Sequence, residues 1–175
     1  MKIKDIRIIK YFVIDVDGTL TDSGIYYDEQ GNETKKFSTR DAAGFFALKK
    51  YGIKTIILTG RESSSVKRRL SEMKVDYLFQ NVKDKYSFLK DFMKTRNINP
   101  EEICYVGDDL NDLSPMLLCG TVACPKDACK EIKLKADFIS EKNGGEGAFR
   151  DIVEQMFTNI GEWENLIKEI YNTGV

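Results

Sequence analysis

The fold is indicated most clearly by the stretch Val13-Ile14-Asp15-Val16-Asp17-Gly18-Thr19-Leu20-Thr21. The apolar run from Tyr11 to Ile14 predicts a buried strand, and it leads directly into two aspartates separated by one residue. Because side chains alternate along a strand, Asp15 and Asp17 can converge at its carboxyl end, where open α/β sheets bind ligands. Two carboxylates this close repel each other unless a divalent cation neutralises them. An ordinary Asp-Gly turn after a strand is the alternative, and the rest of the chain decides between the two.

Three later segments carry related chemistry. A predicted strand ends at Thr59-Gly60-Arg61, where a phosphate can rest on the hydroxyl group and on N–H groups at the start of the next helix. Another strand ends at the acidic segment Gly107-Asp108-Asp109-Leu110-Asn111-Asp112, which opens a helix. Lys85 lies early in a predicted helix between them, and its ammonium group suits a phosphoryl oxygen. For Lys85 the alternative is a solvated helix lysine like its neighbour Lys83.

The composition excludes several classes of protein. The 175 residues are enough for one domain with a core, and 42% of them are hydrophobic and 31% charged, as in ordinary soluble proteins. The net charge of −1 and the lack of a basic tract give no indication of a nucleic-acid or anionic-membrane partner. No apolar run approaches the roughly 20 residues of a membrane span. The amino terminus lacks the apolar core of a signal peptide, so we expect a cytoplasmic protein.

The chain contains no histidine. This excludes a Ser-His-Asp triad, a Cys-His pair and a phosphohistidine intermediate. The four cysteines form no Cys-x-x-Cys pair, so we expect reduced, partly buried thiols rather than a zinc site; they are Cys104, Cys119, Cys124 and Cys129. Acid–base chemistry therefore falls to carboxylates, lysine, tyrosine or metal-bound water, which agrees with a role for Asp15 and Asp17.

Predicted strands and helices alternate along most of the chain. Strands are expected at residues 8–14, 54–58, 77–79, 103–106, 121–124 and 137–139. Helices are expected at residues 41–51, 62–73, 84–96, 111–119 and 147–158. This alternation predicts an α/β fold with a doubly wound, Rossmann-like parallel sheet that helices cover on both faces.

Two segments depart from this alternation within what we expect to be a single domain over residues 1–175. Residues 24–37 alternate around a Gly31-Asn32 turn, which predicts a β-hairpin inserted after the first strand. Residues 159–175 form a carboxyl-terminal tail, in which Trp163–Tyr171 has the apolar spacing of a short amphipathic helix. That helix can dock on this chain or on a neighbour.

In their order along the chain, the four motifs resemble those of the haloacid dehalogenase (HAD) superfamily of phosphotransferases. Asp15–Thr19 matches the first motif, Thr59 the second, Lys85 the third and Gly107–Asp112 the fourth. The resemblance implies a HAD-like fold and a Mg²⁺-dependent phosphatase. In it Asp15 is the nucleophile and Asp17 the general acid and base, while Thr59 and Lys85 hold the phosphoryl oxygens.

The resemblance also implies how the metal is held. Mg²⁺ would bind Asp15, the backbone carbonyl of Asp17, and Asp108, with waters completing its octahedron. Asp109 and Asp112 would orient Lys85, the metal-bound waters or the start of the helix. Two aspartates in the first turn of a helix also interact favourably with its dipole, which is the alternative explanation for them.

The spacing of the motifs leaves no room for a cap domain. HAD phosphatases that act on small metabolites often carry a cap between the first and second motifs or between the second and third. Here 39 residues separate Thr19 from Thr59, and 25 separate Thr59 from Lys85. The hairpin and one helix account for the first interval, and a helix and a strand account for the second. A macromolecular substrate or a neighbouring subunit must then exclude water from the site.

Several arginines and a glycine-rich segment favour a neighbouring subunit and a small anionic substrate. Arginine binds carboxylates through two parallel hydrogen bonds, and Arg61 follows Thr59 after one glycine. An exposed basic helix face is the alternative for Arg68, beside Arg69. The glycines of Asn143–Arg150 allow the backbone to approach a ligand or another chain closely, whereas a flexible loop before a helix is the alternative.

Together with the hairpin, these segments are similar to the capless HAD branch that contains the 3-deoxy-D-manno-octulosonate 8-phosphate (KDO-8-phosphate) phosphatases. The similarity runs from about Tyr11 to about Glu154. It implies a homotetramer in which one subunit's hairpin closes a neighbour's site. It also implies substrate contacts from a set of residues near the motifs: Thr39, Arg40, Asp41, Gly60, Arg61, Arg69 and Arg150.

Within this branch the sequence favours the octulosonate enzymes. Arg61 stands where the related nonulosonate (KDN and sialic acid) 9-phosphate phosphatases tend to carry Glu. Thr19 departs from the Val of many members, and the tail after Met156 follows no family pattern. We therefore predict hydrolysis of KDO-8-phosphate through an aspartyl-phosphate. A nonulosonate 9-phosphate phosphatase is the alternative, and a non-catalytic oligomerisation module or a protein phosphatase are alternatives from other classes.

Overall fold

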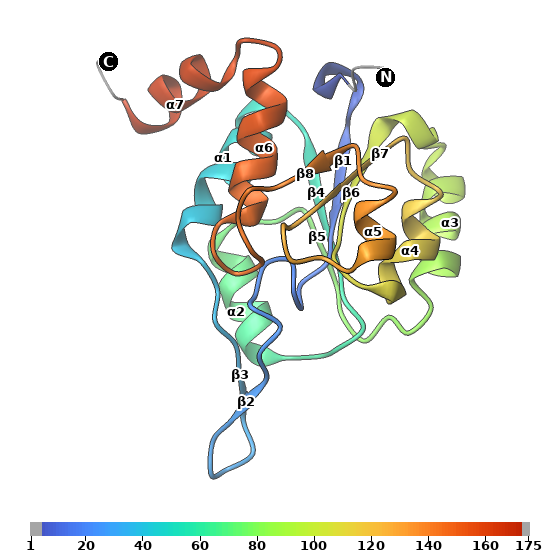
Figure 1. Ribbon diagram of the computed structural model, residues 1–175, viewed down its shortest axis with the longest axis vertical. Helices are drawn as coiled ribbons and strands as arrows, with labels where there is room; N and C mark the ends of the chain where they lie inside the picture. Colours follow the sequence, from blue (N-terminus) through green and yellow to red (C-terminus); the bar gives the residue numbers. More distant parts are fainter. Residues whose placement is uncertain (1–4, 173–175) are drawn as a thin grey trace.

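The computed structural model describes residues 5–172, which fold around a six-stranded sheet (Figure 1). The strands lie in the order β5-β4-β1-β6-β7-β8, and every neighbouring pair is parallel. Their bounds are β1 Tyr11–Ile14, β4 Lys54–Leu58, β5 Tyr77–Phe79, β6 Ile103–Val106, β7 Thr121–Cys124 and β8 Phe138–Ile139. The chain therefore starts at the centre, winds to one edge and then crosses to the other, which confirms the doubly wound α/β fold.

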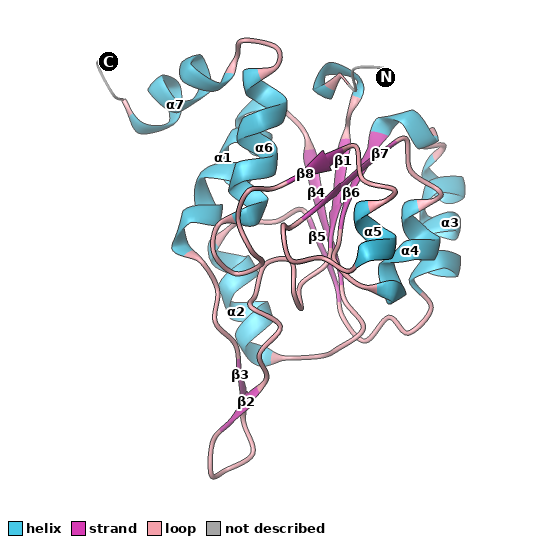
Figure 2. Ribbon diagram, in the orientation of Figure 1, coloured by secondary structure: helices cyan, strands magenta, loops and turns pink. Residues whose placement is uncertain are grey.

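Helices cover both faces of the sheet (Figure 2). One face carries α1 Ala42–Tyr51, α2 Ser64–Glu72, α6 Ala148–Thr158 and α7 Trp163–Tyr171. The other carries α3 Lys85–Arg96, α4 Leu110–Met116 and α5 Lys130–Lys133. Alternate residues of β1 serve the two cores: Phe12 and Ile14 pack in the first, and Val13 packs in the second. Burial on both faces explains why the central strands are continuously apolar.

The predicted elements are present, with shifted ends. The strand expected from residue 8 begins at Tyr11, because Ile6–Ile8 form a 3₁₀ turn in which the Asp5 carboxylate accepts the Arg7 N–H. The helix expected at 111–119 ends at Met116, since the following N–H groups bond three residues back in a tighter turn. The single turn α5 was not predicted, because four residues carry too little periodicity. Two further 3₁₀ turns span Thr39–Asp41 and Pro100–Glu102.

The hairpin projects from the body of the molecule beyond α2 (Figure 1). Its strands β2 Tyr26–Tyr27 and β3 Glu33–Thr34 are antiparallel. The loop between them is longer than the predicted Gly31-Asn32 turn, and the Asp28 carboxylate closes it by accepting the N–H of Asn32 at 2.8 Å. A bridge between Thr21 and Phe37 closes the base of the hairpin.

The described part of the tail docks on its own chain. Helix α7 packs against α1 and α6, with Leu166 only 6% exposed. Lys50 of α1 pairs with Glu169 of α7 at 2.9 Å. The Arg150 guanidinium of α6 lies over the Trp163 ring, 5.9 Å from its centroid.

The intervals between the motifs contain no cap domain in the part of the chain that the structure describes. Between β1 and β4 lie only the hairpin, one 3₁₀ turn and α1, and between β4 and α3 lie only α2 and β5. Among residues 5–172, no helix combines the length and the apolar character that crossing a membrane requires.

Candidate active site

The motif residues meet at one edge of the sheet. Asp15 follows β1, Thr59 follows β4, and Asp108 follows β6 after a single glycine. These three strands are neighbours, and Ile14 is level with Ile57 on one side and with Val106 on the other. Their carboxyl ends therefore lie side by side where the strand order reverses, which is the usual ligand position in such sheets.

Lys85 bridges two aspartates in the centre of this site. Its Nζ lies 2.8 Å from Oδ1 of Asp15 and 2.8 Å from Oδ1 of Asp112. The three side chains are 3%, 4% and 0% exposed, in that order. Burial alone would lower the pKa of Lys85, but the carboxylates of Asp15 and Asp112 outweigh it and raise the pKa. Lys85 is therefore a buried cation, whereas Lys83 is exposed and donates to the Gly60 carbonyl at 2.6 Å.

Asp112 is fully engaged by donors around it. Its Oδ1 accepts the Tyr105 hydroxyl at 2.8 Å as well as Lys85. Its Oδ2 accepts the N–H of Asp108 at 3.1 Å and that of Asp109 at 3.5 Å. Asp112 thus fixes both Lys85 and the start of α4, the kind of orienting contact expected from the sequence.

Asp108 completes an acidic cluster suited to a metal ion. Carboxylate oxygens of Asp15, Asp108 and Asp112 lie within 4.8 Å of one another. Thr19 donates its hydroxyl to Oδ1 of Asp108 at 2.9 Å. Gly18, with φ of +97°, lies so close that a Cβ would fall 2.0 Å from Oδ2 of Asp108. Only glycine therefore fits at this point of the first motif.

Burial and mutual repulsion make the carboxyl groups of the cluster difficult to ionise. Burial raises the pKa of Asp15 to about 7, with repulsion from Asp112 adding to it and Lys85 opposing it. Burial and the charges of Asp15 and Asp112 raise the pKa of Asp108 to about 8. Neighbouring carboxylates that resist ionisation are neutralised by a hard divalent cation. The all-oxygen donor set fits Mg²⁺.

The Asp17 carboxylate is not part of this cluster. Its side chain is 24% exposed and pairs with Nζ of Lys35 from the hairpin. The metal contact expected of Asp17 uses its backbone carbonyl, so the side chain remains available for another role.

Thr59 and Arg61 follow β4 and form the side of the active site next to the end of β1. Thr59 is 2% exposed, and its backbone is held on both sides by bonds to Phe79 and Val82. Its hydroxyl oxygen accepts the N–H of Arg61 at 3.3 Å. The Arg61 guanidinium pairs with Glu33 and donates to the Tyr27 hydroxyl at 3.2 Å, both in the hairpin.

The other predicted substrate residues lie in different surroundings. Asp41 is buried, and its Oδ1 accepts the Arg150 N–H at 3.0 Å, which ties the 3₁₀ turn Thr39–Asp41 to α6. Arg69 donates to the Ser38 carbonyl at 3.3 Å and pairs with Glu72 at 3.1 Å. Thr39 and Arg40 are exposed.

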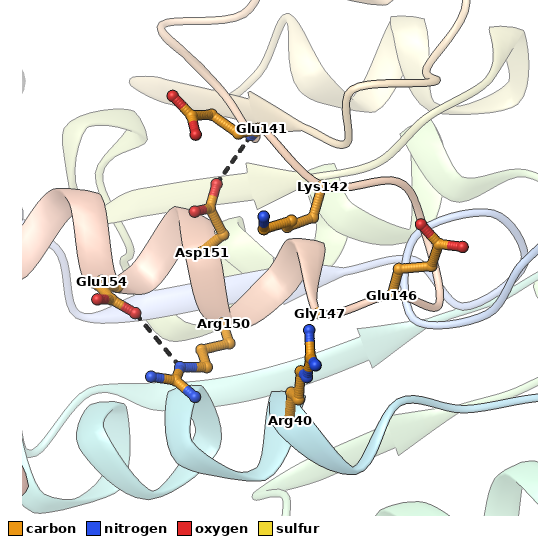
Figure 3. Close-up of a pocket in the computed structure, with 8 residues that line it drawn as sticks. All are labelled: Arg40, Glu141, Lys142, Glu146, Gly147, Arg150, Asp151 and Glu154. Atoms are coloured by element: carbon orange, nitrogen blue, oxygen red, sulfur yellow. Dashed lines mark hydrogen bonds and ion pairs between the residues drawn. The ribbon is translucent and has the colours of Figure 1, made fainter.

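Arg40 and Arg150 line a separate pocket of about 310 Å³ (Figure 3). Arg150 pairs there with Glu154 at 3.3 Å. The remaining charged residues of the pocket are mainly acidic: Glu141, Lys142, Glu146, Asp151 and Glu154. Acidic side chains thus line the pocket beside both arginines, and the substrate contacts expected of Arg40 and Arg150 stay predictions.

The glycine-rich segment packs directly on the loop that follows β1. A Cβ on Gly144 would fall 1.8 Å from the Gly18 carbonyl oxygen, and one on Gly145 would fall 2.5 Å from the Asp22 nitrogen. Gly144 also donates to the Asp127 carboxylate at 2.9 Å. The glycines therefore allow two backbone segments of the same chain to touch beside the active site, whereas the sequence suggested a close approach to a ligand or to another chain.

Three residues at the site were not predicted: Glu33, Lys35 and Tyr105. Tyr105 lies inside an apolar strand, where a buried hydroxyl carries no sequence signal. Glu33 and Lys35 alternate along one side of the hairpin, but their pattern does not show that this side returns to the active site.

Comparison with known proteins identifies a matching family and relatives that share one described activity. A model of the haloacid dehalogenase-like hydrolases matches residues 12–83 and 78–152. A curated KDO-8-phosphate phosphatase of Haemophilus influenzae is 33% identical over 154 residues, which cover 88% of this chain and 86% of that protein. The corresponding Escherichia coli K12 enzyme is 32% identical over 154 residues, which cover 88% of this chain and 82% of that protein.

Solved structures of KDO-8-phosphate phosphatases are also similar to this chain. A Moraxella catarrhalis KDO-8-phosphate phosphatase in complex with magnesium, phosphate and KDO superposes with a TM-score of 0.88 at 34% identity, covering 94% of this chain and 95% of that one. A cobalt-bound Haemophilus influenzae enzyme gives a TM-score of 0.83 at 32% identity over 90% of this chain and 92% of its own. The chain belongs to the haloacid dehalogenase-like hydrolases, within the family of the KDO-8-phosphate phosphatases.

Proposed function

We propose that this protein is a Mg²⁺-dependent phosphatase that hydrolyses KDO-8-phosphate to KDO and phosphate. The observation that carries the proposal is the buried Asp15–Lys85 pair beside Asp108 at the ends of β1 and β6. Support also comes from relatives that cover most of this chain, are named for this reaction and, in one case, contain magnesium, phosphate and KDO.

Asp15 is the nucleophile in this proposal. Lys85 holds its Oδ1, so Oδ2 is the oxygen that attacks phosphorus. The bond from phosphorus to the sugar oxygen breaks as the bond to Asp15 forms, which gives an aspartyl-phosphate. Water then attacks this phosphorus, and phosphate leaves as Asp15 is regenerated.

Asp17 supplies and removes the proton. It donates to the leaving sugar oxygen in the first step and accepts a proton from water in the second. Its partly exposed carboxylate is better placed for exchange with solvent than the buried Asp15.

The phosphoryl group is held by Thr59 and Lys85, whose hydroxyl, backbone and ammonium groups provide donors for its oxygens. Mg²⁺ bound by Asp15, the Asp17 carbonyl and Asp108 would neutralise charge on the phosphoryl oxygens. Asp112 and Asp109 keep Lys85 and the start of α4 in place through the contacts described above.

In this proposal the carboxylate of the sugar acid binds to the guanidinium group of Arg61. A guanidinium group binds a carboxylate with two parallel hydrogen bonds, and Arg61 lies two residues after the phosphate-binding Thr59. Contacts from Thr39, Arg40, Asp41, Gly60, Arg69 and Arg150 remain predictions from the family resemblance. The cytoplasmic location remains a prediction as well.

A homotetramer is part of the same proposal. The site lacks a cap within residues 5–172, and the hairpin exposes three large apolar residues: Ile25, Tyr26 and Tyr27, at 41%, 50% and 64%. Apolar side chains that project from the body in this way fit a contact with another subunit, which could then enclose a small substrate.

The test is phosphate release from KDO-8-phosphate and from KDN-9-phosphate, each measured with Mg²⁺ and with EDTA. We expect strong Mg²⁺-dependent preference for the octulosonate. Preference for the nonulosonate would retain the mechanism and overturn the assignment of Arg61. Release from neither sugar would contradict the proposal and direct attention to phosphopeptides or to a scaffold role.

A further inference from the structure

Two charged residues of the hairpin, Glu33 and Lys35, lie in the active site, where they connect Asp17 with Arg61. Lys35 pairs with Asp17 and, at 2.9 Å, with Glu33. Glu33 pairs in turn with Arg61. The result is one continuous chain of alternating charges, which we call the hairpin network: Asp17, Lys35, Glu33 and Arg61. It links the general acid of the proposed mechanism to the arginine assigned to the substrate carboxylate.

The middle of the hairpin network is shielded and its ends are open. The Lys35 side chain is 0% exposed and that of Glu33 is 13% exposed, compared with 24% for Asp17 and 41% for Arg61. The hairpin network carries two positive and two negative charges, so it is neutral when no substrate is bound. The Arg61 side chain is open to solvent, and a ligand carboxylate that binds it would add one negative charge to this balanced set.

Arg61 is not saturated by Glu33. Its Nη2 serves both Glu33 and the Tyr27 hydroxyl, while its buried Nε has no hydrogen-bond partner among residues 5–172. A guanidinium group reaches its best carboxylate geometry when two N–H groups act in parallel. Glu33 reaches the guanidinium through Nη2 alone, so a substrate carboxylate that accepts two parallel N–H groups of Arg61 would bind better than Glu33 does.

We infer that Glu33 occupies Arg61 as an internal substitute for the substrate carboxylate, and that the substrate must displace it. The inference rests on the proposed function. After its displacement from Arg61, Glu33 remains paired with Lys35, because Glu33 is more buried than Asp17, the other carboxylate that Lys35 binds. Lys35 then gives up Asp17, whose carboxylate becomes free to face the leaving oxygen of the sugar.

This exchange makes Glu33 and Lys35 positioning residues that select for acidic substrates. A phosphate ester without a carboxylate does not compete with Glu33 for Arg61. Asp17 therefore stays bound to Lys35, and turnover is slow. A sugar acid drives the exchange with the binding energy of its own carboxylate, away from the reacting phosphate. The structure thus assigns part of the substrate specificity to the hairpin of the same chain.

The experiment compares KDO-8-phosphate with glucose 6-phosphate, a sugar phosphate that has no carboxylate. In Lys35→Gln, kcat/KM for glucose 6-phosphate should rise by about fivefold or more, while the value for KDO-8-phosphate should not rise, so that discrimination falls. In Glu33→Gln, KM for KDO-8-phosphate should fall about threefold because the competitor for Arg61 is neutral. Its kcat should fall too, because glutamine cannot draw Lys35 from Asp17.

Lys36→Gln is the matched control, since Lys36 is 57% exposed and lies 3.7 Å from Asp22 outside the hairpin network. It should leave the discrimination unchanged, and circular dichroism should show each variant to be folded. Equal losses on both substrates in Lys35→Gln, or an unchanged or raised KM in Glu33→Gln, would overturn the inference alone. A wild-type enzyme that does not prefer KDO-8-phosphate to glucose 6-phosphate would instead overturn the proposed function.

Discussion

Two charged networks lie at the same edge of the sheet and differ in their exposure to solvent. The central network, formed by Asp15, Lys85 and Asp112, is almost completely buried. The hairpin network of Asp17, Lys35, Glu33 and Arg61 is open at both ends. A buried ion pair is costly to break, whereas a partly exposed one exchanges partners at low cost. The difference indicates that the central network provides fixed chemistry and the hairpin network provides selection.

The largest expected effect comes from removing the nucleophile. Asp15→Asn should lower kcat by at least about 10⁴-fold, because an amide cannot form the aspartyl-phosphate. Since asparagine is nearly isosteric, the circular dichroism spectrum and the thermal midpoint should stay close to those of the wild type. Activity near the wild-type level would show that the central network does not contain the nucleophile.

The second effect tests whether the central network is fixed. Lys85→Met should abolish activity and lower the free energy of unfolding by about 3–5 kcal/mol, because it leaves Asp15 and Asp112 buried without their cation. Lys83→Met is the matched control, since Lys83 is an exposed neighbour, and it should be nearly neutral. Urea denaturation of both variants gives the comparison, and equal losses would contradict the structural role of Lys85.

The third effect is a pH dependence that Mg²⁺ should remove. The raised pKa values of Asp15, about 7, and Asp108, about 8, mean that the folded, metal-free protein binds more protons than the unfolded chain. The stability of the metal-free protein should therefore fall as the pH rises from about 4 to about 8. Metal binding must displace these protons, so Mg²⁺ should bind more tightly and stabilise more as the pH rises.

Thermal unfolding with EDTA and with Mg²⁺ across this pH range checks the prediction. Titration calorimetry in buffers of different ionisation enthalpy would report the released protons. An affinity for Mg²⁺ that does not change with pH would contradict the proton-occupied cluster.

The smallest effect on chemistry is expected in the tail. Leu166→Ala should lower the free energy of unfolding by about 2 kcal/mol, because Leu166 is the buried anchor of α7 on α1. The values of kcat and KM should stay within about twofold of the wild type, since α7 contacts neither charged network. Loss of activity in a folded Leu166→Ala protein would show that the tail contributes to the site.

The sequence predicted the central network well and the hairpin network poorly, for physical reasons. Asp15 of the central network directly follows a buried strand, and its neighbours Thr59 and Asp108 lie within two residues of the ends of adjacent strands. Parallel strands bring their carboxyl ends together wherever the sheet order allows. Lys35 and Glu33 reach the site only because the hairpin folds back at the bridge between Thr21 and Phe37. No local sequence pattern predicts that the hairpin folds back toward the active site.

The same distinction applies to the fold. Long apolar strands and periodic helices were predicted to within a few residues, whereas the single turn α5 was missed. Asp41 was expected at the substrate, and its burial against the Arg150 N–H depends on how α6 packs, which composition and spacing do not reveal. Its role in substrate binding remains a prediction.

The most direct test of the account is to identify the phosphorylated residue during turnover. Wild-type protein mixed with KDO-8-phosphate and Mg²⁺ should be acid-quenched, digested and analysed by mass spectrometry. We expect phosphate on Asp15, and none in the presence of EDTA or in Asp15→Asn. Phosphate on another residue, or rapid release of phosphate with no phosphorylated protein at any time, would contradict it.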